Sequence, residues 1–136
     1  MIYFDSSAIA KLVGVEDETA PLVRWLRRRL GSELVTSALA EVEVPRAVRR
    51  SRPELLGDVA GVLRRFDRVE VNDAVRATAA AYSEPHLRSL DAIHLATADV
   101  LIASGKAVSA FVTYDRRQGA AARDAGLTVS APGTSR

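Results

Sequence analysis

The residues of this sequence that could do chemistry are acids standing next to short apolar runs. Asp5 comes directly after apolar residues 2–4, and Asp115 follows another apolar run in the segment FVTYDRR. Asp91 stands near the start of a stretch with helical spacing. A carboxylate at the edge of a hydrophobic core is costly unless a partner compensates its charge. The positions of these acids therefore raise the question of what they hold.

Several carboxylates at one place would need a cation. Three or four of them within ~5–6 Å repel one another, and some would take up protons unless positive charge lay among them. Mg²⁺ or Mn²⁺ supplies that charge through hard oxygen ligands. The sequence has no cysteine, and its two histidines, His86 and His94, have no zinc-site spacing. We interpret His94, beside an apolar helix face, as packed or hydrogen-bonded rather than as a ligand.

Each acid also has a purely structural interpretation. Asp5 could cap a helix that follows it, and Asp115 could belong to an ordinary strand-to-helix turn. Asp91 in the first turn of a helix would favour the helix dipole, and Glu43 could pair with an arginine one turn later. These alternatives stay open for any one residue. Four acids placed near one rim favour a shared site.

The elements that must position these acids alternate between strands and helices. Short β-like runs predict strands at 2–5, 34–37, 68–71, 110–114 and 127–130. Helical spacing or caps predict helices at 22–30, 53–63, 72–81, 90–104 and 116–125, with Asn72 and Ser89 as N-caps. This alternation indicates an α/β domain with a mostly parallel sheet. In such sheets, sites form at the carboxyl ends of the strands, where the strand order reverses.

Composition agrees with one cytoplasmic domain. The 136 residues carry a net charge of +2, and no apolar run approaches the ~20 residues needed to cross a membrane. We expect a single domain over residues 1–131, a frayed tail over 132–136, no secretory leader and no membrane association. Of the 19 basic residues only Lys11 and Lys106 are lysine, so 17 are arginine. Clustered guanidinium groups suit phosphate and carboxylate, although solvated helix faces would explain them equally well.

Taken together, four segments resemble the acidic motifs of a known family. IYFDSSAIAKL, SALAEVEVPRAV, LDAIHLATA and FVTYDRR are similar to the four motifs of PIN-domain nucleases, and more narrowly to VapC-type toxins of bacterial type II toxin–antitoxin pairs. The resemblance runs from residue 1 to about residue 131. It implies a three-layer α/β/α fold with a central, mostly parallel sheet in the strand order 3-2-1-4-5.

The resemblance also implies roles for single residues. Asp5, Glu43 and Asp91 match the core acids of the motifs, and Asp115 matches the fourth, more variable one. Thr113 matches a hydroxyl position near that fourth acid, and Ser6 matches the small residue after the first. The implied activity is Mg²⁺- or Mn²⁺-dependent cleavage of RNA, with neutralisation by a cognate VapB-like antitoxin and homodimer formation. The RNA that is cut and the number of ions stay open.

The second motif offers two glutamates. Glu41 and Glu43 are two residues apart, so on a helix they point about 200° apart and cannot both face one site. Apolar residues flank each, so periodicity does not choose between them; the family pattern favours Glu43. Pro45 would remove a helical hydrogen bond to the carbonyl of Glu41 and could kink the helix. If the helix instead began near Pro45, Glu43 would lie at its entry.

The expected mechanism is metal-assisted hydrolysis of a phosphodiester. Asp5 and Asp91 would hold a first ion with help from Glu43, and Asp115 would recruit a second ion or bind through water. Five arginines would hold the RNA backbone or an acidic antitoxin tail: Arg46, Arg49, Arg50, Arg116 and Arg117. Receiver and haloacid-type phosphatase signatures do not fit, because Ser6 and Ser7 stand where they need a further acid. A PIN-like domain that binds metal or protein without cutting RNA is the alternative.

Overall fold

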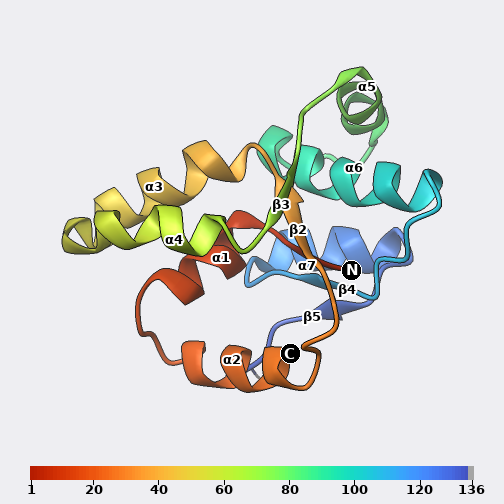
Figure 1. Ribbon diagram of the computed structural model, residues 1–136. Coiled ribbons are helices and arrows are strands. Elements are labelled where there is room, and N and C mark those ends of the chain that lie inside the picture. The colour runs from red at the N-terminus through yellow and green to blue at the C-terminus, as the bar shows by residue number, and fades with distance from the viewer. Residues whose placement is uncertain (135–136) are drawn as a thin grey trace.

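Five short strands form a parallel sheet in the centre of the computed structural model, in which residues 1–134 are described (Figure 1). The strands are β1 Ile2–Phe4, β2 Leu34–Ser37, β3 Asp67–Val69, β4 Ala110–Val112 and β5 Val129–Ser130. Their order is β3-β2-β1-β4-β5, and each neighbouring pair is parallel. The predicted fold class and strand order are confirmed. Four strands differ from the predicted ranges by one to two residues at their ends.

Helices cover both faces of the sheet, so the fold has three layers (Figure 1). The helices are α1 Ser6–Val13, α2 Thr19–Arg27, α3 Ala40–Ser51, α4 Val59–Leu63, α5 Asp73–Ala81, α6 Ser89–Ala103 and α7 Arg116–Asp124. A 3₁₀ helix, Pro53–Asp58, precedes α4, so the helix predicted over 53–63 is divided in two. Asn72 caps α5 as predicted, because its side chain accepts a hydrogen bond from the Val75 amide.

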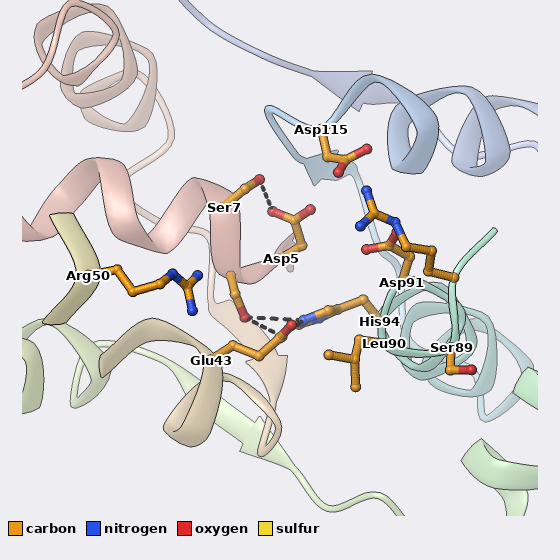
Figure 2. A pocket seen from close by; sticks show the side chains of 11 residues that line it. Asp5, Ser7, Glu43, Arg50, Ser89, Leu90, Asp91, His94 and Asp115 are labelled. Carbon is orange, nitrogen blue, oxygen red and sulfur yellow. Dashed lines mark hydrogen bonds and ion pairs between the residues drawn. The ribbon is translucent and has the colours of Figure 1, made fainter. Parts of the chain in front are cut away.

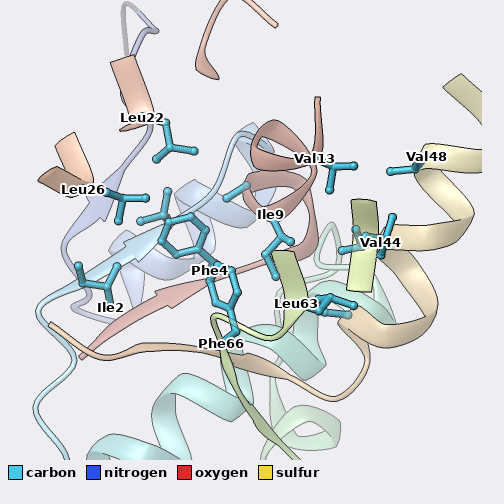
Figure 3. Packing of buried hydrophobic residues seen from close by; sticks show 14 of the residues in the cluster. Ile2, Phe4, Ile9, Val13, Leu22, Leu26, Val44, Val48, Leu63 and Phe66 are labelled. Carbon is cyan, nitrogen blue, oxygen red and sulfur yellow. The ribbon is translucent and has the colours of Figure 1, made fainter. Parts of the chain in front are cut away.

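The central strand β1 divides the hydrophobic core into two parts. Ile2 and Phe4 face one way and pack with side chains of α1, α2, α3 and α4, as Figure 3 shows for the larger cluster. Tyr3 faces the other way and packs with α6 and α7. All three β1 residues are buried because the strand has a neighbour on each edge and helices on each face. A strand buried on both faces is a continuous apolar run in sequence, which is what made residues 2–4 recognisable.

Helix α3 begins at Ala40 and passes through Pro45 without ending. Glu41 and Glu43 therefore both lie in its first turn, and the alternative in which the helix starts near Pro45 is wrong. Helix α6 begins one residue earlier than predicted. Arg88, in extended backbone, is its N-cap and offers no side-chain cap, whereas Ser89 is already helical. The predicted capping role of Ser89 is therefore wrong.

The end of the described chain lies against the rest of the fold. The Tyr114 hydroxyl donates to the carbonyl of Pro132 (2.8 Å), and the Thr134 hydroxyl donates to the carbonyl of Ala131 (2.7 Å). Residues 135–136 of the predicted tail lie outside the described residues. Among residues 1–134, no helix has the length and apolar character to span a membrane.

Candidate active site

The four predicted acids line one cleft at the carboxyl ends of β1 and β4. The cleft has a volume of about 430 Å³. Figure 2 shows Asp5 between Glu43 and Asp115, with Asp91 nearby on α6. The lining residues are Asp5, Ser6, Ser7, Glu43, Arg50, Arg88, Ser89, Leu90, Asp91, His94 and Asp115. Four helices and two strand ends thus bring together acids that are up to 110 residues apart, from residue 5 to residue 115.

Asp5 is held rigidly at the end of β1. Its Oδ1 accepts hydrogen bonds from the Ser7 hydroxyl (2.6 Å) and from the Ala8 amide (3.1 Å), which makes Asp5 the N-cap of α1. Its Oδ2 accepts a hydrogen bond from the Thr113 hydroxyl. Asp5 is only 4% exposed, and this burial raises the pKa of its carboxyl although the three donors and the charge of His94 oppose the shift. Asp5 therefore caps α1 and lines the cleft at the same time.

Asp115 occupies the corresponding corner after β4. Its Oδ1 accepts a hydrogen bond from the Gln118 amide (3.0 Å), so Asp115 is the N-cap of α7. Its own amide donates to the Thr113 hydroxyl oxygen (3.1 Å). Thr113, predicted as a supporting hydroxyl, thus joins the two corners, because the same oxygen accepts from Asp115 and donates to Asp5.

Glu43, and not Glu41, faces the cleft. Both the Ser6 hydroxyl (2.7 Å) and Nε2 of His94 (2.7 Å) bind its Oε1. Burial acts to raise the pKa of Glu43, but the hydrogen bond and charge of His94 and the hydrogen bond from Ser6 bring it below its ordinary value. The Glu41 side chain is 51% exposed and pairs with Arg68 across to β3 (3.1 Å). The two side chains point apart, as helical geometry requires.

His94 meets the Glu43 carboxylate, and both of its ring nitrogens have hydrogen-bond partners. Nε2 meets Glu43, and Nδ1 lies 2.7 Å from the Tyr3 hydroxyl. The histidine is 2% exposed and is hydrogen-bonded. Tyr3 was not among the predicted site residues, although a tyrosine within a buried strand is a signal, because its hydroxyl needs a partner wherever the ring is buried.

Asp91 carries the clearest sign of unbalanced negative charge. It is half-buried in the first turn of α6. Burial raises the pKa of Asp91 most, the charges of Asp115 and Asp5 raise it further, and Arg88 and His94 only partly offset them. A cation in the cleft would relieve this repulsion.

The residues present fit a hard divalent cation through their donor chemistry. All four acids offer carboxylate oxygens, which Mg²⁺ and Mn²⁺ prefer. Within residues 1–134, no three histidine or acidic side chains come close enough together to hold a metal ion by themselves. Mg²⁺ does not require a cage of protein ligands alone, since it keeps several waters and is commonly held by one or two carboxylates together with substrate phosphate. The cleft therefore fits a partly hydrated ion.

The predicted arginines fall into two groups. Arg46 and Arg50 line a groove that adjoins the cleft along α3, and Arg116 lines another beyond Asp115. Arg49 and Arg117 are exposed and line neither groove nor the cleft. Two arginines were missed, Arg88 in the cleft and Arg123 in the groove beyond Asp115. The position of Arg88 depends on where α6 begins, and that of Arg123 depends on which face of α7 is turned toward the groove.

Comparison with known proteins gives matches along nearly the whole chain. The family model described as PIN domain matches residues 2–124. Over 136 residues, all of both chains, the sequence is 49% identical to Ribonuclease VapC35 of Mycobacterium tuberculosis. It is 37% identical to Ribonuclease VapC47 of the same species, over 139 aligned residues that again span both chains completely.

Two solved structures share the fold at low sequence identity. The first, titled as a toxin–antitoxin complex from Klebsiella pneumoniae, has a TM-score of 0.71 at 17% identity and covers 97% of this chain and 98% of that one. The second, Mycobacterium tuberculosis VapC20, is titled as a toxin that cleaves the sarcin–ricin loop. It has a TM-score of 0.70 at 17% identity and covers 89% of this chain and 95% of its own.

Proposed function

Because this chain belongs to the PIN-domain family, and within it to the VapC ribonucleases, we propose that it is the toxin of a toxin–antitoxin pair and cleaves RNA at the carboxylate cleft. The support from sequence is the 49% identity to Ribonuclease VapC35 over both full chains. The single structural observation that carries the proposal is the meeting of Asp5, Glu43, Asp91 and Asp115 in one cleft.

The proposed reaction is hydrolysis of an RNA phosphodiester with Mg²⁺ or Mn²⁺. When bound, the ion supplies the positive charge that activates water as a nucleophile and offsets the charge developing on the phosphate. Asp5 and Asp91 would hold the ion. Three hydrogen-bond donors fix the carboxylate of Asp5, and the neighbouring acids destabilise the ionised form of Asp91, which a cation would stabilise. Glu43 would present its Oε2 to the ion or its water. Asp115, whose side chain accepts one hydrogen bond among residues 1–134, would adjust when the phosphate arrives.

The RNA backbone is proposed to follow the arginines on both sides of the acids. Arg46 and Arg50 lie on the α3 side, and Arg116 and Arg123 lie beyond Asp115. None of the four forms an ion pair with an acid among residues 1–134 at 4.0 Å or less, so all are available to phosphates. A single strand is the proposed substrate, because unpaired bases are more accessible to proteins than those of A-form helices.

The same arginines are proposed to receive the acidic part of a VapB-like antitoxin. A carboxylate-rich segment would compete with RNA phosphate for the guanidinium groups and so block the cleft. Homodimer formation remains a prediction from the resemblance, and a cytoplasmic location remains a prediction from the composition of the sequence. Sedimentation of the purified chain at several concentrations tests the first.

The test of the proposed function is RNA cleavage by the purified chain. A pool of single-stranded RNAs is incubated with the wild type in Mg²⁺, in Mn²⁺ and in EDTA, and an Asp5→Ala variant serves as the catalytic control. We expect cleavage with either metal, none in EDTA, and none by the variant. Induced expression should arrest growth for the wild type only. Equal growth arrest by both proteins would overturn the nuclease assignment. Binding of metal without cleavage of any RNA would support the alternative, a PIN-like binding module.

A further inference from the structure

A buried chain of polar side chains runs from the middle of the sheet to the acid cleft. It begins at the Tyr3 hydroxyl on β1, passes through both ring nitrogens of His94 on α6, and ends at Oε1 of Glu43 on α3. Tyr3 is completely buried, and His94 nearly so. Burying polar groups this deeply is costly unless they are hydrogen-bonded, and here each has a partner.

We propose that His94 is a positioning residue that holds Oε1 of Glu43 and thereby aims Oε2 of the same carboxylate into the cleft. The inference rests on the proposed function, because it assigns Glu43 a place beside the metal. His94 itself binds no ion, since Nε2 is turned to Glu43 and Nδ1 to Tyr3. It acts through Glu43, and Tyr3 acts through His94.

The geometry around Glu43 supports this assignment. Both donors to Glu43, the Ser6 hydroxyl and the His94 ring, bind the same oxygen, Oε1. Oε2 accepts no hydrogen bond from any side chain or amide of residues 1–134, while the carboxylate lines the cleft. Figure 2 shows His94 and Glu43 meeting on the side of Asp5 opposite Asp115. Oε1 of Glu43 is thus fixed by two donors, so that Oε2 is presented to the cleft.

The ring of His94 is fixed in its turn. The Tyr3 hydroxyl lies 2.7 Å from Nδ1 of His94 and makes a buried hydrogen bond with it. Nδ1 accepts from this hydroxyl in the neutral ring and donates to its oxygen in the protonated ring, and in both states Nε2–H is donated to the carboxylate of Glu43. Tyr3 is stacked on Phe111, with ring centroids 5.0 Å apart, and meets the His94 ring edge-on. A rigid strand thus determines the orientation of a glutamate on α3.

The test compares variants that keep or delete single donors in the purified full chain. His94→Leu removes the donor, and His94→Gln places an amide N–H near the position of Nε2. Tyr3→Phe removes only the hydroxyl that orients the ring. Tyr82→Phe is the matched control, because the Tyr82 hydroxyl also binds a side chain of α6, Asp99, outside the cleft. For each, the Mn²⁺ dissociation constant is measured without RNA, together with KM, kcat and the melting temperature.

We expect His94→Leu to weaken Mn²⁺ binding and lower kcat by about 10- to 100-fold, the range found when outer partners of metal ligands are removed, with KM nearly unchanged. Tyr3→Phe should have a smaller effect in the same direction, His94→Gln should restore most of the loss, and Tyr82→Phe should change neither quantity. In a Glu43→Gln background, His94→Leu should add no further loss, because the interaction through which it acts is already absent.

Three results would overturn the inference. His94→Leu could lower the melting temperature but leave the Mn²⁺ dissociation constant equal to that of Tyr82→Phe, which would make the network structural only. The losses of Mn²⁺ affinity and of kcat caused by His94→Leu and by Glu43→Gln could be additive in the double variant. The wild type could fail to bind Mn²⁺ at all. Mn²⁺ binding that follows the expected order without cleavage of RNA would instead keep the inference and reject the proposed function.

Discussion

Two corners of the sheet carry an aspartate in the same structural position. Asp5 stands between β1 and α1, and Asp115 stands between β4 and α7. The two strands are neighbours, and each aspartate caps the helix after it by accepting a hydrogen bond from the amide three residues later. Both line the cleft. The sequence pattern that produces the two corners is therefore the same.

The corners differ in how the carboxylate is held. Asp5 is buried, and both of its oxygens are bound, whereas Asp115 is partly exposed and has one side-chain hydrogen bond. The cap alone does not explain the burial of Asp5, because an exposed carboxylate caps a helix equally well. The fold thus keeps a buried charge that stability does not need. We infer that Asp5 is the fixed ligand and Asp115 the adjustable one.

The largest expected effect is that of Asp5→Asn. Asparagine keeps the capping acceptor and the shape of the side chain but removes the charge that would hold the ion. We expect the rate of RNA cleavage to fall on the order of a thousandfold, since several kcal/mol of charge stabilisation are lost. Because burial raises the pKa of Asp5, ionisation of this carboxyl opposes folding at neutral pH. The melting temperature in EDTA should therefore stay the same or rise.

Asp5→Ala is the control for this pair of effects. It removes the charge and also the cap of α1, so it should lose activity equally but destabilise the protein by about 1 kcal/mol. Initial rates in Mg²⁺ and thermal unfolding followed by circular dichroism measure both quantities. An Asp5→Asn protein that cleaves RNA at the wild-type rate would remove the distinction between the two corners.

The next largest effect is expected from a pair of glutamates within one helix. Glu43→Gln should lower the cleavage rate about 100-fold, because an amide presents a weaker oxygen to a cation than a carboxylate does. Glu41→Gln is the matched control on the same helix. It should leave the rate within about twofold and the stability within about 1 kcal/mol, since an exposed ion pair such as Glu41 with Arg68 contributes little. Equal losses from both changes would contradict the placement of Glu43 at the site.

The sequence predicted the fold and the site to different depths. The buried strands β1 and β4 were recognisable because they are continuous apolar runs, but the strand order came from a family resemblance and not from periodicity. Asp5 and Asp115 could be placed at one rim without the resemblance, since the carboxyl ends of parallel strands lie at the same edge of a sheet. The choice of Glu43 over Glu41 needed the family pattern, because apolar residues flank both.

Other features of the site depend on contacts that no local pattern reveals. The partners Tyr3 and His94 are 91 residues apart in the chain, so only the fold brings the hydroxyl to the ring. Serine is a residue type that often caps helices, but the backbone is already helical at Ser89, so Arg88 occupies the N-cap position of α6. Arg88 and Arg123 were missed for a similar reason, because the direction of a long exposed side chain follows from helix ends and faces that composition does not determine.

A smaller effect is expected from Asp115→Asn. Asparagine is as good an N-cap as aspartate, so the melting temperature should not change, and only the negative charge is lost. We expect the rate to fall about tenfold and the Mg²⁺ concentration for half-maximal rate to rise. A tenfold loss is the lower end of the range found when a partner outside the direct metal ligands is removed. A titration of the rate with Mg²⁺ measures both. A loss as large as that of Asp5→Asn would show that the two aspartates are equivalent ligands.

The smallest effect is expected next to the corner at Asp115, and it concerns stability and not activity. The side chain of Gln118 is fully buried behind the α7 cap, and neither its Nε2 nor its Oε1 has a hydrogen-bond partner among residues 1–134. An unsatisfied buried amide costs about 1–3 kcal/mol. Gln118→Met, which has similar shape and keeps the backbone amide that binds Asp115, should therefore raise the melting temperature by about 3–5 °C without changing the cleavage rate.

Gln118→Glu is the opposing control for this prediction. It buries a charge in the same space, so the melting temperature should fall, and by more than Gln118→Met raises it. Thermal unfolding of the three proteins in EDTA measures the order directly. A Gln118→Met protein that melts below the wild type would mean that the buried amide is satisfied in solution. In that case the contrast between a fully bonded corner at Asp5 and an incompletely bonded one at Asp115 would have to rest on the two aspartates alone.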